Sequence, residues 1–463
     1  MERIYQVLKT IFLYLSLLCT CLSPLCGGGD LKSCKLMLPG NRNRYVQIAA
    51  ADEGLDIWQP RETYGGYRYG PSMILNRDGS LDVWSAANGP GDMIDLISHS
   101  RLTCGGRFHS RETIALKPTA GSSDQQWTCD PGVIKIGKYY YIGYTSTQDP
   151  RGVNNSVYVA RSRKPNGPFL EKWDGNGWSD EPAPLIPYTG DPEGFGAGEP
   201  AFVLMGTRLY IYYSWNIPGA DTTCVATADA TKENWPATLK YHGTCIPAKT
   251  DGDSADVKYL DQYGRFLAVF TEKRFSGDSY IAVWESFDGL RFRQSSFVKA
   301  KTAKRLHNCG ISGRADGHIA AGDPVYLAYA YGADWGNWPT RLHKVKLSLA
   351  KSPKRNPAAE QNVEIPQKRS KDRVISNIQT IKAEKQRYDI KRSEHIWAMA
   401  FDSDGYYYPI LFGVRFDGYD PSIIRIVGSR IFAVGNGVTR VRLHWHGYTG
   451  DFMVYAGSSA NTK

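Results

Sequence analysis

The chain has 463 residues, long enough for two or three average domains, and 12% of these residues are aromatic. It carries 56 Lys and Arg against 46 Asp and Glu, a formal net charge of +10. Most of that excess comes from residues 351–394, which hold twelve basic and six acidic side chains. Because the charge gathers in one polar, proline-containing segment, we interpret it as a solvated or loosely docked linker and expect no nucleic-acid partner.

The amino end has the pattern of an export signal. Arg3 and Lys9 precede the apolar run Ile11 to Leu18, and a Cys-, Ser- and Gly-rich stretch follows. The run is too short for a bilayer-spanning helix, so we expect no membrane span. We predict a signal peptide over residues 1–26 and a secreted or cell-surface protein. Lipid attachment at Cys26 stays open as an alternative, although the preceding Leu25 is bulky for such a signal.

A strand pattern recurs five times between about residue 61 and residue 349. Its register points lie 54 to 69 residues apart, and a β-prone run, a turn and an aromatic second strand follow most of them. Repeats of this length built from short strands are typical of propeller blades. We therefore predict an all-β fold with a five-bladed β-propeller over residues 30–349, onto which residues 30–60 close as a lead-in. The copies begin Tyr69-Gly70-Pro71, Cys129-Asp130-Pro131, Gly198-Glu199-Pro200, Ala255-Asp256-Val257 and Cys309-Gly310-Ile311.

The end of the chain changes character after the basic linker, which we place at residues 350–380. Alternating strands with tight Gly turns follow, including Ala433-Val-Gly-Asn-Gly437 and the strand after it. This segment resembles the bacterial Ig-like domains of group 2 over about 75 residues. The resemblance implies a small Ig-like β-sandwich over residues 381–463, serving as a spacer or adhesion module without chemistry of its own.

Three carboxylates occupy one register of the repeat: Asp130, Glu199 and Asp256. First strands of propeller blades line the central channel, so these side chains should converge there. A pair of carboxylates is what glycosidic bond cleavage needs, one as general acid and one as base or nucleophile. The competing interpretation is structural, since a residue before Pro is biased toward extended backbone and could simply begin a strand.

The Asp130-Pro and Glu199-Pro blades resemble those of five-bladed glycoside hydrolases of the family 43, 62 and 32 type, over roughly residues 61–349. In that group blade one supplies a base or nucleophile, blade two an orienting Asp, and blade three the general acid. The resemblance implies that Glu199 is the acid and Asp130 the second-blade Asp. Blade one departs from the pattern because Gly70 stands where an Asp is expected. Asp256 or Asp130 would then have to act as base, and Tyr69 is a further candidate nucleophile.

Several other residues near the register points are candidates for substrate binding. His307 resembles a channel His of family 43 enzymes, and Arg68 could bind hydroxyls or a substrate carboxylate. The bland alternative, which such residues more often fit, is a buried structural residue for His307 and an ion-pair partner for Arg68. Rings in Gly-rich loops suit sugar stacking or core packing. The predicted substrate-binding set is Tyr69, Arg68, His307, Trp335 and Trp338.

No Cys-x-x-Cys pair or Cys/His cluster occurs, so we predict no metal site and no cofactor, leaving only a channel cation such as calcium open. Cys224 and Cys245 flank a short strand–loop–strand and could pair in an oxidising compartment.

The leading hypothesis is a secreted, monomeric glycoside hydrolase acting on a polysaccharide or oligosaccharide, with arabinose- or xylose-containing substrates implied by the resemblance alone. The alternatives are a non-catalytic carbohydrate-binding propeller and a surface adhesion protein. Gly70 makes the first alternative credible.

Overall fold

A computed structural model describes the chain from residue 42 to residue 457, apart from residues 61–65, 90–91, 104–111, 250–254, 334–335, 366–377, 384–385, 397, 403–406, 410–413, 429 and 446. The described part is built from strands with two 3₁₀ turns, η2 (Trp235–Thr238) and η3 (Pro357–Ala359). The predicted signal peptide lies outside the described residues. Within them, no helix is long and apolar enough to cross a membrane.

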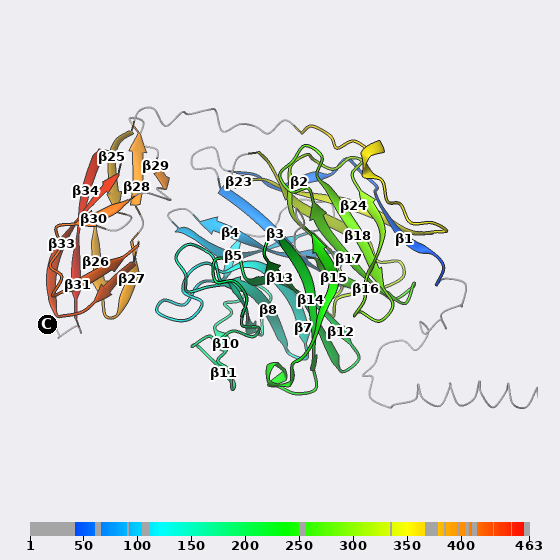
Figure 1. The fold of residues 1–463 in the computed structure, drawn as a ribbon, viewed down its shortest axis with the longest axis horizontal. Coiled ribbons are helices and arrows are strands. Elements are labelled where there is room, and N and C mark those ends of the chain that lie inside the picture. The colour runs from blue at the N-terminus through cyan, green and yellow to red at the C-terminus, as the bar shows by residue number, and fades with distance from the viewer. Residues whose placement is uncertain are drawn as a thin grey trace, which may run out of the picture. The chain divides into compact units, whose positions relative to one another are not determined.

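Five sheets form a ring of blades, as the repeat predicts (Figure 1). The first blade contains β3 (Gly66–Leu75), β4 (Leu81–Gly89), β5 (Asp92–Leu102) and β6 (Thr113–Leu116), with β23 (Asn337–Trp338) added parallel to β3. The second contains β7 (Cys129–Ile136), β8 (Tyr139–Ser146), β9 (Ser156–Ser162), β10 (Glu171–Trp173) and β11 (Trp178–Ser179). The third contains β12 (Ala197–Met205), β13 (Arg208–Ile217), β14 (Ala220–Asp229) and β15 (Lys240–Lys249).

The fourth blade contains β16 (Asp256–Leu260), β17 (Arg265–Glu272), β18 (Tyr280–Ser286), β19 (Arg293–Val298) and β21 (His318–Ile319). The fifth contains β20 (Leu306–Ile311), β22 (Val325–Tyr331) and β24 (Thr340–Ala350), completed by β1 (Tyr45–Ala50) and β2 (Leu55–Trp58). The innermost strands contact one another in the cyclic order β3, β7, β12, β16, β20 and back to β3. All five begin at the same end of the channel, which we call the mouth.

The amino-terminal strand closes the ring. β1 pairs antiparallel with β24, from Tyr45 opposite Ala350 to Ala50 opposite Val345, so the first propeller strand forms the outer edge of the last blade (Figure 1). Of the predicted lead-in over residues 30–60, the strands β1 and β2 pair with β24 and so belong to the fifth blade.

Hydrophobic packing between blades follows from strand periodicity. Successive side chains of a strand point to opposite faces, and each blade has a neighbour on both faces. In β13, Leu209 and Ile211 pack in the core shared by blades two and three, while Tyr210 and Tyr212 pack in the core shared by blades three and four. Further clusters fill the interfaces between blades four and five, one and two, and five and one. Because both faces of each blade are buried, its strands contain nearly continuous runs of apolar and aromatic residues.

The two cysteines considered for a disulfide are both free. Cys224 on β14 packs toward blade two, and Cys245 on β15 packs toward blade four. The sheet lies between the two side chains, so the predicted pairing option is wrong. Cys129 and Cys309 form no disulfide bond either.

The basic segment is less detached than we predicted over its first part. Asn362 is buried, and its amide Nδ2 donates to Ser279 O, Thr302 Oγ1 and Ala303 O at 2.8, 3.0 and 2.9 Å. The Val363 amide donates to Thr302 O at 2.8 Å. Residues 351–365 are therefore docked on blade four, because one buried amide satisfies three acceptors there. Residues 366–377 lie outside the described part.

The carboxyl-terminal strands have a core of their own, in which Ile381, Tyr388, Val441 and Phe452 are buried. That these strands form an Ig-like domain stays a prediction. The three sheets there are β25 (Ile378–Ala383), β28 (Ala398–Asp402) and β29 (Tyr407–Pro409); β26 (Arg387–Ile390), β34 (Tyr448–Ala456), β33 (Gly437–Trp445) and β30 (Arg415–Asp417); and β27 (Ser393–His395), β32 (Arg430–Ala433) and β31 (Ile424–Val427).

Candidate active site

Three inner strands carry the same interruption near the mouth. Pairing skips the dipeptides Gly70-Pro71 in β3, Asp130-Pro131 in β7 and Glu199-Pro200 in β12, each at a bulge. The first residue of each has a positive φ, 58° for Gly70, 51° for Asp130 and 54° for Glu199. Pro suits the second position because it has no N–H to leave unpaired in a bulge.

The backbone at Asp130 and Glu199 differs from the extended conformation that the structural interpretation of these residues expects. A residue before Pro should be extended, whereas both adopt the left-handed conformation that a side chain disfavours. Such conformations cost on the order of 1–3 kcal/mol and cluster at functional sites. Blade one has Gly at the same position, where the conformation carries little cost. Two carboxylates are therefore held in strained positions where Gly would be easier to accommodate.

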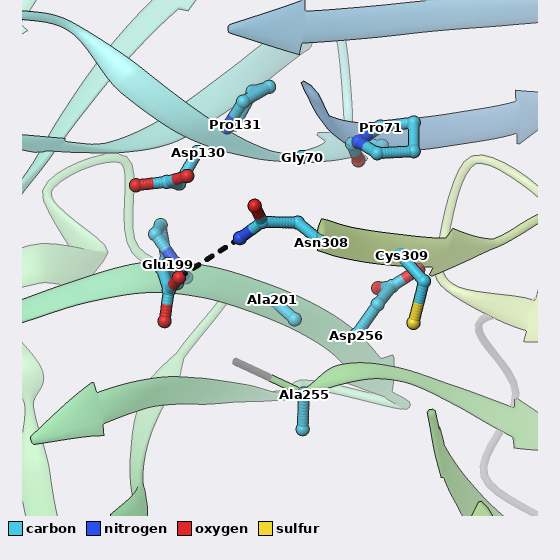
Figure 2. A pocket seen from close by; sticks show the side chains of 12 residues that line it. Gly70, Pro71, Asp130, Pro131, Glu199, Ala201, Ala255, Asp256, Asn308 and Cys309 are labelled. Atoms are coloured by element: carbon cyan, nitrogen blue, oxygen red, sulfur yellow. Dashed lines mark hydrogen bonds between the residues drawn. The ribbon is translucent and has the colours of Figure 1, made fainter. Parts of the chain in front are cut away.

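The bulges line one pocket in the channel. The pocket is lined by Gly70, Asp130, Glu199, Asp256, Asn308 and neighbouring residues of the five inner strands. The three carboxylates predicted from sequence therefore share a single site. Figure 2 shows Asp130, Glu199, Asp256 and Asn308 within this pocket.

Glu199 is positioned by blades two and five. Its backbone N–H donates to Thr145 Oγ1 at 2.7 Å, and its carboxylate Oε1 accepts from Asn308 Nδ2 at 3.1 Å (Figure 2). Asn308 is 2% exposed, and its own Oδ1 is buried without a hydrogen-bond partner in the structure. The amide thus fixes the rotation of the Glu199 carboxyl group, and a buried acceptor lies beside it in the pocket wall.

Asp130 lies against the backbone of blade one. A Cβ built on Gly70 would stand 3.4 Å from both Asp130 Cα and Asp130 Oδ1. Burial and the neighbouring Asp130 and Asp95 carboxylates raise the pKa of the Cys129 thiol well above its ordinary value. The thiol next to Asp130 therefore stays neutral. The missing side chain at Gly70 leaves space directly beside the Asp130 carboxylate.

Asp256 has a different environment. It lies in a regularly paired strand, with no bulge between Asp256 and Leu260. Its Oδ1 accepts from Lys258 Nζ at 2.5 Å, and its Oδ2 accepts from the Ile311 amide at 2.8 Å. An ion pair and a backbone bond to the next blade are typical of a residue that joins blades four and five. Its equivalence to Asp130 and Glu199, inferred from register, does not extend to the backbone.

The fifth blade has a bulge before the register point that we predicted at Gly310. Pairing of β20 with β22 shifts between Leu306 and Cys309, and Asn308 lines the pocket there. The register point is therefore not Gly310. Gly310 packs against the next blade, since an added Cβ would stand 1.9 Å from Pro71 O. Sequence reasoning missed Asn308 because this blade lacks the Pro that marks the other three bulges.

A buried cluster lies behind blade one's register point. Tyr67 and Tyr69 both donate to Asp95, Tyr69 through its hydroxyl to Oδ2 at 2.7 Å. Burial raises the pKa of Asp95 to about 6, against the opposing effect of these two hydrogen bonds. Burial also raises the pKa of the Tyr69 phenol well above its ordinary value, which weakens the case for a tyrosine nucleophile. Sequence reasoning missed Asp95, which stands between apolar residues in the strand Asp92–Leu102.

Most of the predicted substrate-binding residues are buried and present no open face. His307 is 4% exposed and stacks on Tyr69 with ring centroids 4.9 Å apart, and Trp338 is 3% exposed against both. Arg68 forms a bidentate ion pair with Glu112 and lines a separate cavity between blades one and five. None of these four lines the channel pocket, and their role as sugar contacts stays a prediction. Trp335 lies outside the described residues.

No set of three or more His, Cys, Asp and Glu side chains in the described part of the chain is arranged to hold a metal ion. The chemistry that the pocket can perform with its own residues is proton transfer and hydrogen bonding by carboxylates.

The sequence matches no family model and no curated protein. Among solved structures the chain is similar to an α-L-arabinofuranosidase from Podospora anserina, with 11% identity, a TM-score of 0.46, and coverage of 67% of this chain and 98% of that one. It is also similar to a family 117 glycoside hydrolase from Zobellia galactanivorans, with 13% identity, a TM-score of 0.47, and coverage of 66% and 91%. A sucrose-6-phosphate hydrolase from Lactobacillus gasseri has 9% identity, a TM-score of 0.46, and coverage of 87% and 88%.

Proposed function

We propose that the chain is an exported glycoside hydrolase whose channel pocket cleaves a glycosidic bond of an oligosaccharide or polysaccharide. The observation that carries the proposal is the pair Asp130 and Glu199, held at φ 51° and 54° in equivalent bulges and lining one pocket. A chain that places two carboxylates in disfavoured backbone at one site gains something other than stability from them. Two carboxyl groups around a small pocket suit acid and base catalysis of glycoside hydrolysis.

Glu199 is the general acid in this proposal. Its carboxyl group is oriented through Oε1 by the Asn308 amide, which is itself buried and cannot swing away freely. Orientation of this kind matters because a general acid must reach the leaving oxygen within hydrogen-bond distance. Asn308 is then a positioning residue.

Asp130 is the second carboxylate. The space left at Gly70 lies directly beside it and would admit a water molecule or a sugar hydroxyl. Asp256 is less suited to the role of base, because Lys258 and the Ile311 amide each occupy one of its oxygens. Its task in the proposal is to hold blades four and five together below the reacting groups.

The experiment compares wild type, Glu199→Gln and Asp130→Asn on aryl glycosides and on arabinan, xylan and fructan polymers. Binding is followed by calorimetry. Glu233→Gln, an exposed glutamate outside the pocket lining, serves as the matched control. We expect Glu199→Gln to lower kcat by roughly 10²- to 10⁴-fold on substrates with poor leaving groups while binding persists. Dinitrophenyl glycosides should be much less affected, since their leaving group needs no proton.

A non-catalytic sugar-binding propeller is the second candidate, and Gly70 is the observation that favours it. This function predicts saturable glycan binding by wild type and Glu199→Gln alike, with no turnover by either protein on any substrate. That result would overturn the hydrolase proposal and leave the pocket as a sugar-binding site. Equal turnover by wild type and both carboxylate variants would remove Glu199 and Asp130 from the chemistry altogether.

A further inference from the structure

The loop that leads into Glu199 presents an exposed aromatic ring at the mouth of the channel. Phe195 is 73% exposed, four residues before Glu199 and two before β12 begins. Four residues of extended chain span at most about 14 Å, so the Phe195 backbone lies within that distance of the Glu199 backbone. An isolated exposed apolar residue is ordinary on a protein surface and by itself implies nothing.

The loop that carries Phe195 is fixed along its backbone to blade two. Phe195 O accepts from the Asn155 amide at 3.0 Å and from Asn155 Nδ2 at 2.6 Å. Gly194 O accepts from the Asn154 amide at 2.8 Å, and the Ala197 amide donates to Asn155 O at 2.9 Å. The phenyl ring therefore projects from a backbone that is hydrogen-bonded on both sides of it.

The residues flanking Phe195 show why only this side chain can project outward. A Cβ on Gly194 would stand 2.2 Å from Asn216 Oδ1, and one on Gly196 would stand 2.3 Å from the Asn155 backbone N. The Gly196 carbonyl also accepts from the Asn216 amide at 2.8 Å. The loop is thus held closely against both blade two and blade three, and Phe195 is the one large side chain in Gly194–Gly198.

Electrostatic contacts add to this anchoring. Arg151 forms a bidentate pair with Glu193, at 2.6 and 3.2 Å, and the Glu193 amide donates to Asp191 Oδ1 at 3.0 Å. Exposed ion pairs contribute little stability, but this one joins the β8–β9 connection to the loop. A ring on an ordered loop loses little conformational entropy when a ligand stacks on it.

We propose that Phe195 is an aromatic platform on which a second sugar residue of the bound chain stacks, outside the residue held by Asp130 and Glu199. The ligand class is then an oligosaccharide of at least two residues that leaves the pocket over the rim formed by blades two and three. Sugars present a face of C–H groups that packs on aromatic rings. This inference rests on the proposed function, because it assumes that a sugar occupies the carboxylate pocket.

The test compares Phe195→Ala and Phe195→Trp with Leu170→Ala. Leu170 is a matched control because it is 67% exposed and precedes β10, at the end of blade two opposite the mouth. Each protein is titrated with a monosaccharide aryl glycoside and with oligosaccharides of two to five residues, by calorimetry and by kinetics. We expect Phe195→Ala to raise Kd and KM for oligosaccharides about three- to tenfold, leaving the monosaccharide glycoside within twofold. Phe195→Trp should retain or improve oligosaccharide affinity.

The outcomes separate this inference from the function beneath it. If wild type binds oligosaccharides but Phe195→Ala binds them equally well, the proposal for Phe195 is wrong, and the proposed binding of sugar in the carboxylate pocket is unaffected. An equal loss for ligands of every length would also overturn the platform, because it would show a general disturbance of the site. If wild type binds no glycan of any length, both the function and the platform fail. Thermal unfolding of each variant confirms that the fold is intact, as expected for an exposed position.

Discussion

Gly70, Asp130 and Glu199 adopt one backbone conformation in three successive blades, so differences among them are differences of side chain. Gly70 supplies none, and the vacated space lies 3.4 Å from the Asp130 carboxylate. The site can therefore be probed by adding a group as well as by removing one. An Asp is tolerated in this conformation, because Asp130 shows it in the next blade.

We expect Gly70→Asp to place a second carboxylate in contact with Asp130. Like charges at this distance resist simultaneous ionisation, so the pKa of the pair rises in the folded protein. A raised pKa of an acid costs stability once the pH exceeds its unfolded value. Gly70→Asp should thus be less stable than Gly70→Asn by on the order of 1 kcal/mol at pH 8, with the gap closing near pH 4. Denaturant unfolding at both pH values measures this, and a gap independent of pH would contradict it.

Asp95 gives a pH dependence that wild type should already show. Its folded pKa of about 6 lies above the ordinary aspartate pKa of 3.8, so between these two pH values the folded state binds more protons than the unfolded state. Stability from this group is therefore greatest at low pH and declines as the pH rises through 6, by up to about 3 kcal/mol. Asp95→Asn should flatten the decline between pH 4 and 7, as measured by chemical unfolding. The exposed Asp180→Asn is the control and should leave the slope unchanged.

At the scale of elements, the strands and blades could be predicted from the sequence. A strand that is buried on both faces has apolar residues at successive positions, and such runs recur along the chain. Tyr210 to Tyr213 illustrate this, since each face of β13 meets a neighbouring blade. The bulges were not predictable in the same way. Pro71, Pro131 and Pro200 mark three of them, but nothing local marks the shift before Cys309, and so Asn308 was missed. Burial of Trp338 and His307 depends on tertiary packing, which a Gly-rich loop sequence does not reveal.

The edge strand β1 is held by a buried charge as well as by its ladder. Glu285 is fully buried; its Oε2 accepts from the Val46 amide at 2.9 Å and from Arg265 Nη1 at 3.0 Å, and its Oε1 accepts from Arg293. Removing one member of such a group leaves a buried charge without compensation, which costs about 3–5 kcal/mol.

We predict that Glu285→Ala lowers the free energy of unfolding by this amount and raises hydrogen exchange in β1 before other strands. The exposed Glu364→Ala, which removes pairs with Lys304 and Arg305, should cost less than about 1 kcal/mol. Mass spectrometry of exchange in residues 45–50 gives the local readout. Uniform exchange across all blades in Glu285→Ala would argue against a role specific to β1.

At the scale of the whole molecule, the propeller depends on five interfaces of similar kind, one between each pair of neighbouring blades. Val46 and Ile48 of β1 contribute to the interface between blades four and five, so the amino-terminal strand takes part in packing as well as in hydrogen bonding. This framework places the strained bulges and the Phe195 loop at the same end of the channel, the mouth. Residues on the inner strands and residues on the rim loops can then vary separately.

Closure by β1 also sets an order of events during synthesis. The strand that completes the fifth blade is the first of the propeller to leave the ribosome, and its partner β24 is the last, since Tyr45 pairs with Ala350. Until residue 350 has emerged, β1 has no partner, and four blades can at most form an open arc with an uncovered apolar flank. A nascent chain of this design has a long interval in which it is exposed to aggregation and to proteases.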